Sequence, residues 1–249
     1  GLTMGRFASY WAEAKDRLQL AICLGDRFEM FAAVSASVPF NIPFAHISGG
    51  ETTVGAIDDS FRHSLTHMTQ YHFTSTQEHF DRVVQLVGFK EGVYNVGALS
   101  LDNLEKFEPY SGAEFEDRFG IDIDENTILV TLHPETHAVD EVEEHARIVA
   151  ESLAGEPDLK ALITMPNADT AGTKIRNVFH ELTVKHSDRI MEAENLGTRG
   201  YFTAMSRCGF LLGNSSSGIV EASSFGKHVI NLGERQKGRV AGSNVMNVM

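Results

Sequence analysis

The stretch GFLLGNSSSGIVEASSFGKHVINLG, residues 209–233, decides the fold class. Its apolar run at 209–214 has the composition of a buried strand and ends in an Asn-Ser-Ser-Ser-Gly loop. Helical spacing over 217–227 follows at once, and a second apolar run occupies 228–233. A strand, a helix and a strand in this order predict two parallel strands joined by a right-handed crossover.

The same alternation extends through the rest of the chain. Apolar runs at 18–25, 42–48, 71–76, 93–97, 127–134 and 161–166 predict strands, and helical spacing occurs at 27–40, 53–70, 77–88, 138–154 and 170–184. We therefore predict an α/β fold with parallel sheets. The acidic, turn-rich segment 103–126 predicts a linker between two Rossmann-like domains, 1–108 and 109–249. Because the chain opens in a helical segment and ends without a closing helix, we expect an internal portion of a longer enzyme.

Composition narrows the classes of partner. The 249 residues are 42% hydrophobic, which suits one large or two ordinary domains. With 21 Lys and Arg against 34 Asp and Glu, the net charge is −13, and no basic cluster suggests a nucleic-acid partner. Two cysteines, Cys23 and Cys208, are too few for a disulfide framework and favour a reducing, cytoplasmic compartment. No apolar run approaches the roughly 18–20 residues of a membrane span, so no membrane partner is expected.

Acidic residues and a histidine stand at or just after the ends of the first two predicted strands. Since ligands bind beyond the carboxyl ends of parallel strands, these positions are candidates for a site. Asp26, in ICLGDRFEM (22–30), either belongs to such a site or only caps the next helix. In HISGGETTVGAIDD (46–59), the paired glycines permit a tight turn with positive φ. Acids in a first helical turn usually only stabilise the helix dipole, but several candidates converge on this loop and its helix: His46, Glu51, Asp58, Arg62 and His63.

The second half of the chain carries two further candidates. His133 stands at the end of the apolar run 127–134, just before Pro134, and is a proton donor, a phosphate partner or simply a loop residue. In the loop Ser215, Ser216, Ser217 and Gly218, three hydroxyls and a helix N-terminus form either a serine-rich cap or a phosphate cradle.

Residues after the serine loop favour the cradle. Glu221 is placed to accept hydrogen bonds from ribose hydroxyls. Arg235, with Lys237 and Arg239 close behind it, favours a diphosphate ligand. Motifs for P-loop, dinucleotide and zinc chemistry do not occur, so we predict no cofactor and no catalytic metal.

Taken in order, five motifs resemble the hydrolysing UDP-N-acetylglucosamine 2-epimerase family of sialic acid and legionaminic acid biosynthesis. The motifs are GDRFE, HISGGETTVGAIDDSFRH, the LHP segment, MPNADTAG and GNSSSGIVEASSFGKHVINLGERQKGR. The resemblance implies a GT-B-like fold, with two Rossmann-like domains facing a cleft and both chain ends truncated. It also implies a cytoplasmic homodimer or higher homo-oligomer that binds a UDP-amino sugar and UDP.

The resemblance also assigns roles. Asp26, Asp58 and His133 would serve proton transfer and leaving-group contact; Ser215, Ser216, Glu221 and Arg235 would hold UDP; Asn167 and Asp169 would line the cleft. UDP would leave C1 as the C2 proton is removed, and water would then add with inversion at C2, releasing a free manno-configured sugar.

One position departs from the family pattern. Many members carry His-x-Glu-Gly-Gly-Glu at the strand end, and here Ser48 replaces the first glutamate. Because a serine is no carboxylate base, Glu51 would take over its role, and Asp58 is the alternative for the C2 base. A non-acidic residue at this position is associated with the diacetamido substrate of legionaminic acid pathways.

Other classes of function stay open from the sequence: a non-hydrolysing UDP-GlcNAc 2-epimerase, a GT-B glycosyltransferase, or a non-catalytic module that binds a UDP-sugar.

Overall fold

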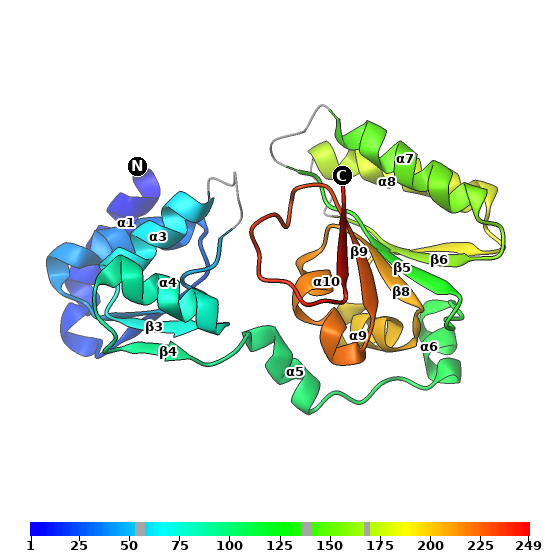
Figure 1. Cartoon of the computed structure of the whole chain (residues 1–249). Helices are drawn as coiled ribbons and strands as arrows, with labels where there is room; N and C mark the ends of the chain where they lie inside the picture. The colour runs from blue at the N-terminus through cyan, green and yellow to red at the C-terminus, as the bar shows by residue number, and fades with distance from the viewer. Residues whose placement is uncertain (53–57, 136–140, 167–169) are drawn as a thin grey trace. The chain divides into compact units, whose positions relative to one another are not determined.

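The computed structural model describes residues 1–52, 58–135, 141–166 and 170–249 of the chain (Figure 1). These residues form two compact units, Gly1–Asp102 and Asn103–Met249. The division falls six residues before the boundary predicted after residue 108. None of the described helices is long and apolar enough to cross a membrane.

The first unit contains a four-stranded parallel sheet in the order β1-β2-β3-β4. Its strands are β1 (Ala21–Leu24), β2 (Phe44–Ile47), β3 (Tyr71–Thr74) and β4 (Val93–Asn95). The main helices are α1 (Leu2–Ala14), α2 (Phe28–Ser37), α3 (Asp58–Met68) and α4 (Gln77–Val87). Short 3-10 turns cover Lys15–Arg17, Val38–Phe40 and Leu99–Leu101.

The two faces of this sheet differ. Cys23, His46, His72 and Val93 stand side by side in register, and all four are buried. The next residues along β1 and β4, Leu24 and Tyr94, are about half exposed, at 56% and 48%. Because side chains alternate between faces along a strand, the core lies on the Cys23 face. His46 therefore points into the interior of the unit.

The second unit contains a six-stranded parallel sheet in the order β10-β9-β8-β5-β6-β7. Its strands are β5 (Thr127–Thr131), β6 (Lys160–Thr164), β7 (Ile190–Ala193), β8 (Phe210–Gly213), β9 (His228–Leu232) and β10 (Val245–Val248). Its helices are α5 (Asp102–Glu105, which begins at the unit boundary), α6 (Gly112–Phe119), α7 (Val142–Gly155), α8 (Thr170–Lys185), α9 (Gly197–Arg207) and α10 (Ser216–Val220).

Separate apolar clusters cover the two faces of this sheet. One joins α7 and α8 to residues such as Val130 and Ile163, and the other joins α6 and α9 to residues such as Leu129 and Leu162 (Figure 1). β5 lies between β6 and β8, so the strand order reverses there. Such a switch point is where open α/β sheets bind ligands, beyond the carboxyl ends of the strands.

The predicted α/β class with two parallel sheets is confirmed, and all eight predicted strands occur. Two edge strands, β7 and β10, were not predicted because their sequences, IMEA and VMNV, carry a polar residue among few apolar ones. The helix predicted over 217–227 is interrupted at Glu221, where α10 gives way to a 3-10 helix, Ala222–Phe225. The alternative role of Asp26 as a cap is wrong, because Arg27 is the N-cap of α2 and no side chain caps that helix.

Candidate functional site

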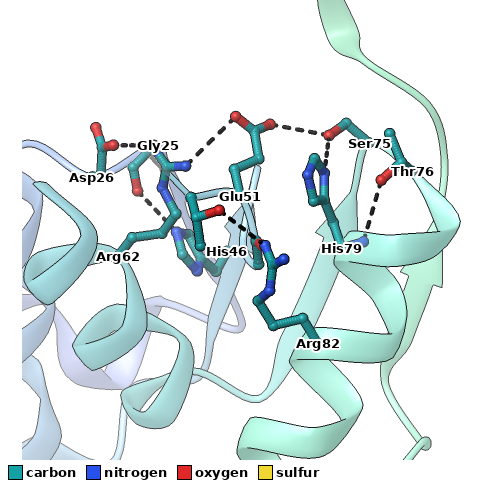
Figure 2. A network of polar contacts seen from close by, with 11 residues as sticks. Gly25, Asp26, His46, Glu51, Arg62, Ser75, Thr76, His79 and Arg82 are labelled. Atoms are coloured by element: carbon teal, nitrogen blue, oxygen red, sulfur yellow. Dashed lines mark hydrogen bonds and ion pairs between the residues drawn. The ribbon is translucent and has the colours of Figure 1, made fainter. Parts of the chain in front are cut away.

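Two carboxylates share one buried guanidinium at the carboxyl edge of the first sheet (Figure 2). Asp26 follows β1, Glu51 follows β2, and Arg62 lies in α3. Arg62 is 4% exposed and donates through Nη2 to Asp26 Oδ2. Its Nη1 lies 3.6 Å from Glu51 Oε2. The structure thus brings together three of the predicted site residues.

Arg62 retains donor capacity after these contacts. Among the described residues, its buried Nε and Nη1 atoms have no hydrogen-bond acceptor. A buried N–H group without an acceptor is costly, so a ligand oxygen that reached it would be bound favourably.

The turn that presents Glu51 depends on left-handed backbone. Gly50 has φ 79° and Ser48 has φ 66°. A Cβ on Gly50 would lie 2.4 Å from the backbone oxygen of His79, so the turn packs directly on α4. Arg82 of α4 donates to Gly50 O at 2.5 Å and to Thr52 Oγ1 at 3.3 Å. Helix α4 therefore supports this turn through both packing and hydrogen bonds.

Two residues that sequence reasoning missed also hold Glu51. Ser75 follows β3 and donates to Glu51 Oε1 at 3.0 Å, and His79 Nδ1 lies 2.8 Å from Ser75 Oγ. The strand-end rule applied to the run at 71–76 would have pointed to Ser75.

His46 is fully buried and contacts protein groups (Figure 2). Its Nε2 lies 2.8 Å from Gly25 O, and because a carbonyl only accepts, Nε2 carries the proton. Its Nδ1 lies 3.3 Å from Thr66 Oγ1. Desolvation lowers the pKa of His46, so the ring is neutral near pH 7. In this position His46 supports the Asp26 loop from inside.

Asp58 begins α3 with an exposed side chain. Partial desolvation of its carboxyl, and next the negative charge of Asp26, raise the pKa of Asp58. This carboxyl therefore keeps a proton at a higher pH than an isolated aspartate does.

A second cluster lies at the switch point of the six-stranded sheet. Asn214, directly after β8, accepts from the backbone N–H of His133 at 2.7 Å and donates to its carbonyl at 2.9 Å. Arg235 and Gln236 each donate to the Asn214 carbonyl at 2.8 Å. Desolvation and the charge of Arg235 lower the pKa of His133 to about 4, so its imidazole is neutral at pH 7. Asn214 stands inside the quoted GNSSSG motif, yet sequence reasoning passed over it.

The serine loop follows Asn214. Ser215 is the N-cap of α10, and its Oγ accepts from Ser217 N at 3.4 Å. Ser217 Oγ lies 2.7 Å from the hydroxyl of Tyr201, a partner that the sequence did not indicate. Gly218 is needed for packing, since a Cβ there would lie 2.9 Å from Val229. Ser216 opens the helix and Glu221 is buried at its C-cap.

Two predicted cleft residues, Asn167 and Asp169, lie outside the described residues. Within the described ranges, no group of three or more His, Cys, Asp or Glu side chains is arranged to hold a metal ion.

Known proteins are similar to this chain in sequence and in fold. The chain is 34% identical over 230 residues to the UDP-N,N'-diacetylbacillosamine 2-epimerase (hydrolyzing) of Legionella pneumophila, covering 92% of this chain and 60% of the relative. It is 32% identical over 228 residues to the GDP/UDP-N,N'-diacetylbacillosamine 2-epimerase (hydrolyzing) of Campylobacter jejuni, covering 92% of this chain and 59% of the relative. The chain therefore spans about three fifths of these relatives.

A solved structure gives the same picture of the fold. The UDP-GlcNAc 2-epimerase of Neisseria meningitidis bound to UDP-GlcNAc matches with a TM-score of 0.75 at 20% identity, covering 92% of this chain and 63% of that one. The family described as UDP-N-acetylglucosamine 2-epimerase matches residues 1–249. This chain belongs to the UDP-N-acetylglucosamine 2-epimerase family.

Proposed function

We propose that this protein binds a UDP-2-acetamido sugar and acts in its hydrolysing 2-epimerisation, in nonulosonic acid biosynthesis. Membership of the family and the names of the two relatives support the reaction class. The observation that carries the proposal is the Asp26–Arg62–Glu51 cluster, which provides carboxylates beside a fixed cation at a ligand-binding edge.

The reaction sets clear demands on the site. A base removes the proton from C2, the C1–O bond to UDP breaks, and a C1=C2 double bond forms. Water then adds its hydroxyl to C1, and a proton returns to C2 on the opposite face. The products are UDP and the free manno-configured sugar. The protein must therefore supply a base, a proton donor and contacts that stabilise the departing diphosphate.

In the first unit, Glu51 is our candidate for the C2 base. Ser75 and Arg62 contact its two oxygens separately, which fixes the carboxylate plane. Asp58, whose pKa is raised, is the candidate proton donor for the second step. Asp26 orients Arg62, and His46 supports the loop that carries Asp26.

In the second unit, we assign UDP to the serine loop and its neighbours. The N-terminus of α10 and the loop hydroxyls suit phosphate oxygens, and Arg235 adds a positive charge beside Asn214. His133, neutral near pH 7, suits a hydrogen bond to the leaving group. The remaining residues of this assignment are Ser215, Ser216, Ser217, Gly218 and Glu221, with Asn167 and Asp169 lining the sugar side.

The substrate that we favour is UDP-2,4-diacetamido-2,4,6-trideoxyglucose over UDP-GlcNAc. Both relatives are named for the diacetylbacillosamine sugar. Ser48, which stands where many members carry glutamate, also favours this substrate.

The test is product analysis by phosphorus and proton NMR with each UDP-sugar. We expect UDP and free manno-configured sugar, formed faster from the diacetamido substrate. Reversible interconversion of two UDP-sugars would indicate a non-hydrolysing epimerase. Turnover that requires an added acceptor would indicate a glycosyltransferase. If UDP raised the melting temperature without any product, the chain would be a binding module. We also propose a homo-oligomer, which light scattering of the purified protein tests.

A further inference from the structure

Ser75, just before α4, and His79 of α4 form a chain of hydrogen bonds that ends at Glu51. Ser75 follows the last residue of β3, and Thr76 is the N-cap of α4, its hydroxyl accepting from His79 N at 3.2 Å. The cap fixes the first turn of α4, which carries His79, and Ser75 Oγ lies 2.8 Å from His79 Nδ1. Figure 2 shows Glu51, Ser75 and His79 joined in a line of two successive hydrogen bonds.

Counting protons along this line fixes the direction of each hydrogen bond. The Glu51 carboxylate only accepts, so Ser75 donates its single hydroxyl proton to Oε1. Ser75 Oγ then has only lone pairs to offer His79, whose Nδ1 lies 2.8 Å away. The proton between them must therefore belong to the imidazole, which makes His79 the Nδ1–H tautomer.

The surroundings favour a rigid arrangement. His79 is 6% exposed, and the Glu51 side chain is 18% exposed. Desolvation lowers the pKa of His79, which keeps the ring neutral near pH 7. Its backbone oxygen also packs against Gly50, so His79 contacts both Ser75 and the turn that carries Glu51.

We propose that Ser75 and His79 are positioning residues for proton transfer by Glu51, with His79 Nδ1–H donating to Ser75 and Ser75 donating to Glu51 Oε1. The catalytic part of this inference rests on the proposed function. The tautomer and the direction of the hydrogen bonds do not.

The first test is nitrogen NMR of the histidine rings in the 15N-labelled 249-residue protein. His79→Asn identifies the His79 signals by their loss. We expect a protonated Nδ1 and an unprotonated Nε2 in the wild-type protein, and loss of this preference in Ser75→Ala. A proton on Nε2, or a spectrum that Ser75→Ala leaves unchanged, would overturn the proposal.

The second test separates kcat from KM. A hydrogen bond to a charged group is worth enough that its loss in Ser75→Ala lowers kcat by about tenfold or more, with KM and UDP affinity unchanged. Ser75→Thr keeps the hydroxyl and should restore kcat. His79→Asn keeps a hydrogen-bond donor and should have a higher kcat than His79→Leu. Ser9→Ala removes an exposed helical serine as the matched control. A Ser75→Ala protein with the kcat of Ser9→Ala would overturn the positioning role. A wild-type protein without turnover would refute the proposed function, and the NMR result would still decide the hydrogen bonds.

Discussion

Replacing Arg62 by methionine removes the guanidinium that contacts both Asp26 and Glu51 and leaves two carboxylates without their shared cation. Breaking a buried ion pair by removing one partner costs about 3–5 kcal/mol. Because the Asp26 and Glu51 side chains are 20% and 18% exposed, water partly compensates them, and we expect about 3 kcal/mol, the lower end of this range. With a urea m-value of about 1–3 kcal/mol/M, the unfolding midpoint falls by about 1–3 M.

Trp11 provides the assay. It is the single tryptophan of the chain and lies in the first unit, 7% exposed, so its fluorescence follows unfolding of that unit alone. The matched control is Arg27→Met, because Arg27 pairs with Glu29 at the exposed surface. Exposed pairs contribute little, and this variant should unfold like the wild-type protein.

If Arg62→Met had the urea midpoint of Arg27→Met at pH 7, the Asp26–Arg62–Glu51 cluster would not be the buried ion pair described above.

Three further predictions concern stability. Burial lowers the pKa of His72 from 6.5 to about 4, so the unfolded chain takes up a proton before the folded chain does. The free energy of unfolding of the first unit therefore falls by up to about 3 kcal/mol as the pH falls from about 6.5 to 4. In the fluorescence assay, His72→Phe should flatten this loss of stability. Gly50→Ala should destabilise far more than Gly88→Ala, because both have positive φ but only at Gly50 would the Cβ meet α4 backbone, at 2.4 Å; equal midpoints would contradict the turn geometry. Asn214→Ala removes both hydrogen bonds to His133 and should cost about 2–3 kcal/mol in the second unit, measured by circular dichroism, and an unchanged melting curve would argue against this link.

The sequence predicted the sheet edge but not the contacts across it. Apolar runs ending in polar residues placed Asp26 and Glu51 beyond successive strands, and the parallel order β1-β2-β3 then brings Asp26, Glu51 and Ser75 to one edge. Which side chain meets which depends on helix placement. The hydrogen bond from Ser75 to Glu51 spans 24 positions, and no local pattern encodes it.

Burial was a second limit. A histidine near the end of a strand has the same appearance in sequence whether it contacts a ligand or supports a loop, and only the register showed that His46 points into the core with His72. Similarly, helical spacing around Glu221 did not reveal that α10 ends there and a 3-10 helix follows.

The most direct test of the central claim, that Glu51 removes the C2 proton, is the kcat of Glu51→Gln for UDP release from the diacetamido UDP-sugar. Glutamine keeps the shape and can still accept from Ser75, but it cannot take a proton. We predict that kcat falls by about 100-fold or more with UDP affinity unchanged. A Glu51→Gln protein that releases UDP at the wild-type rate would contradict the account.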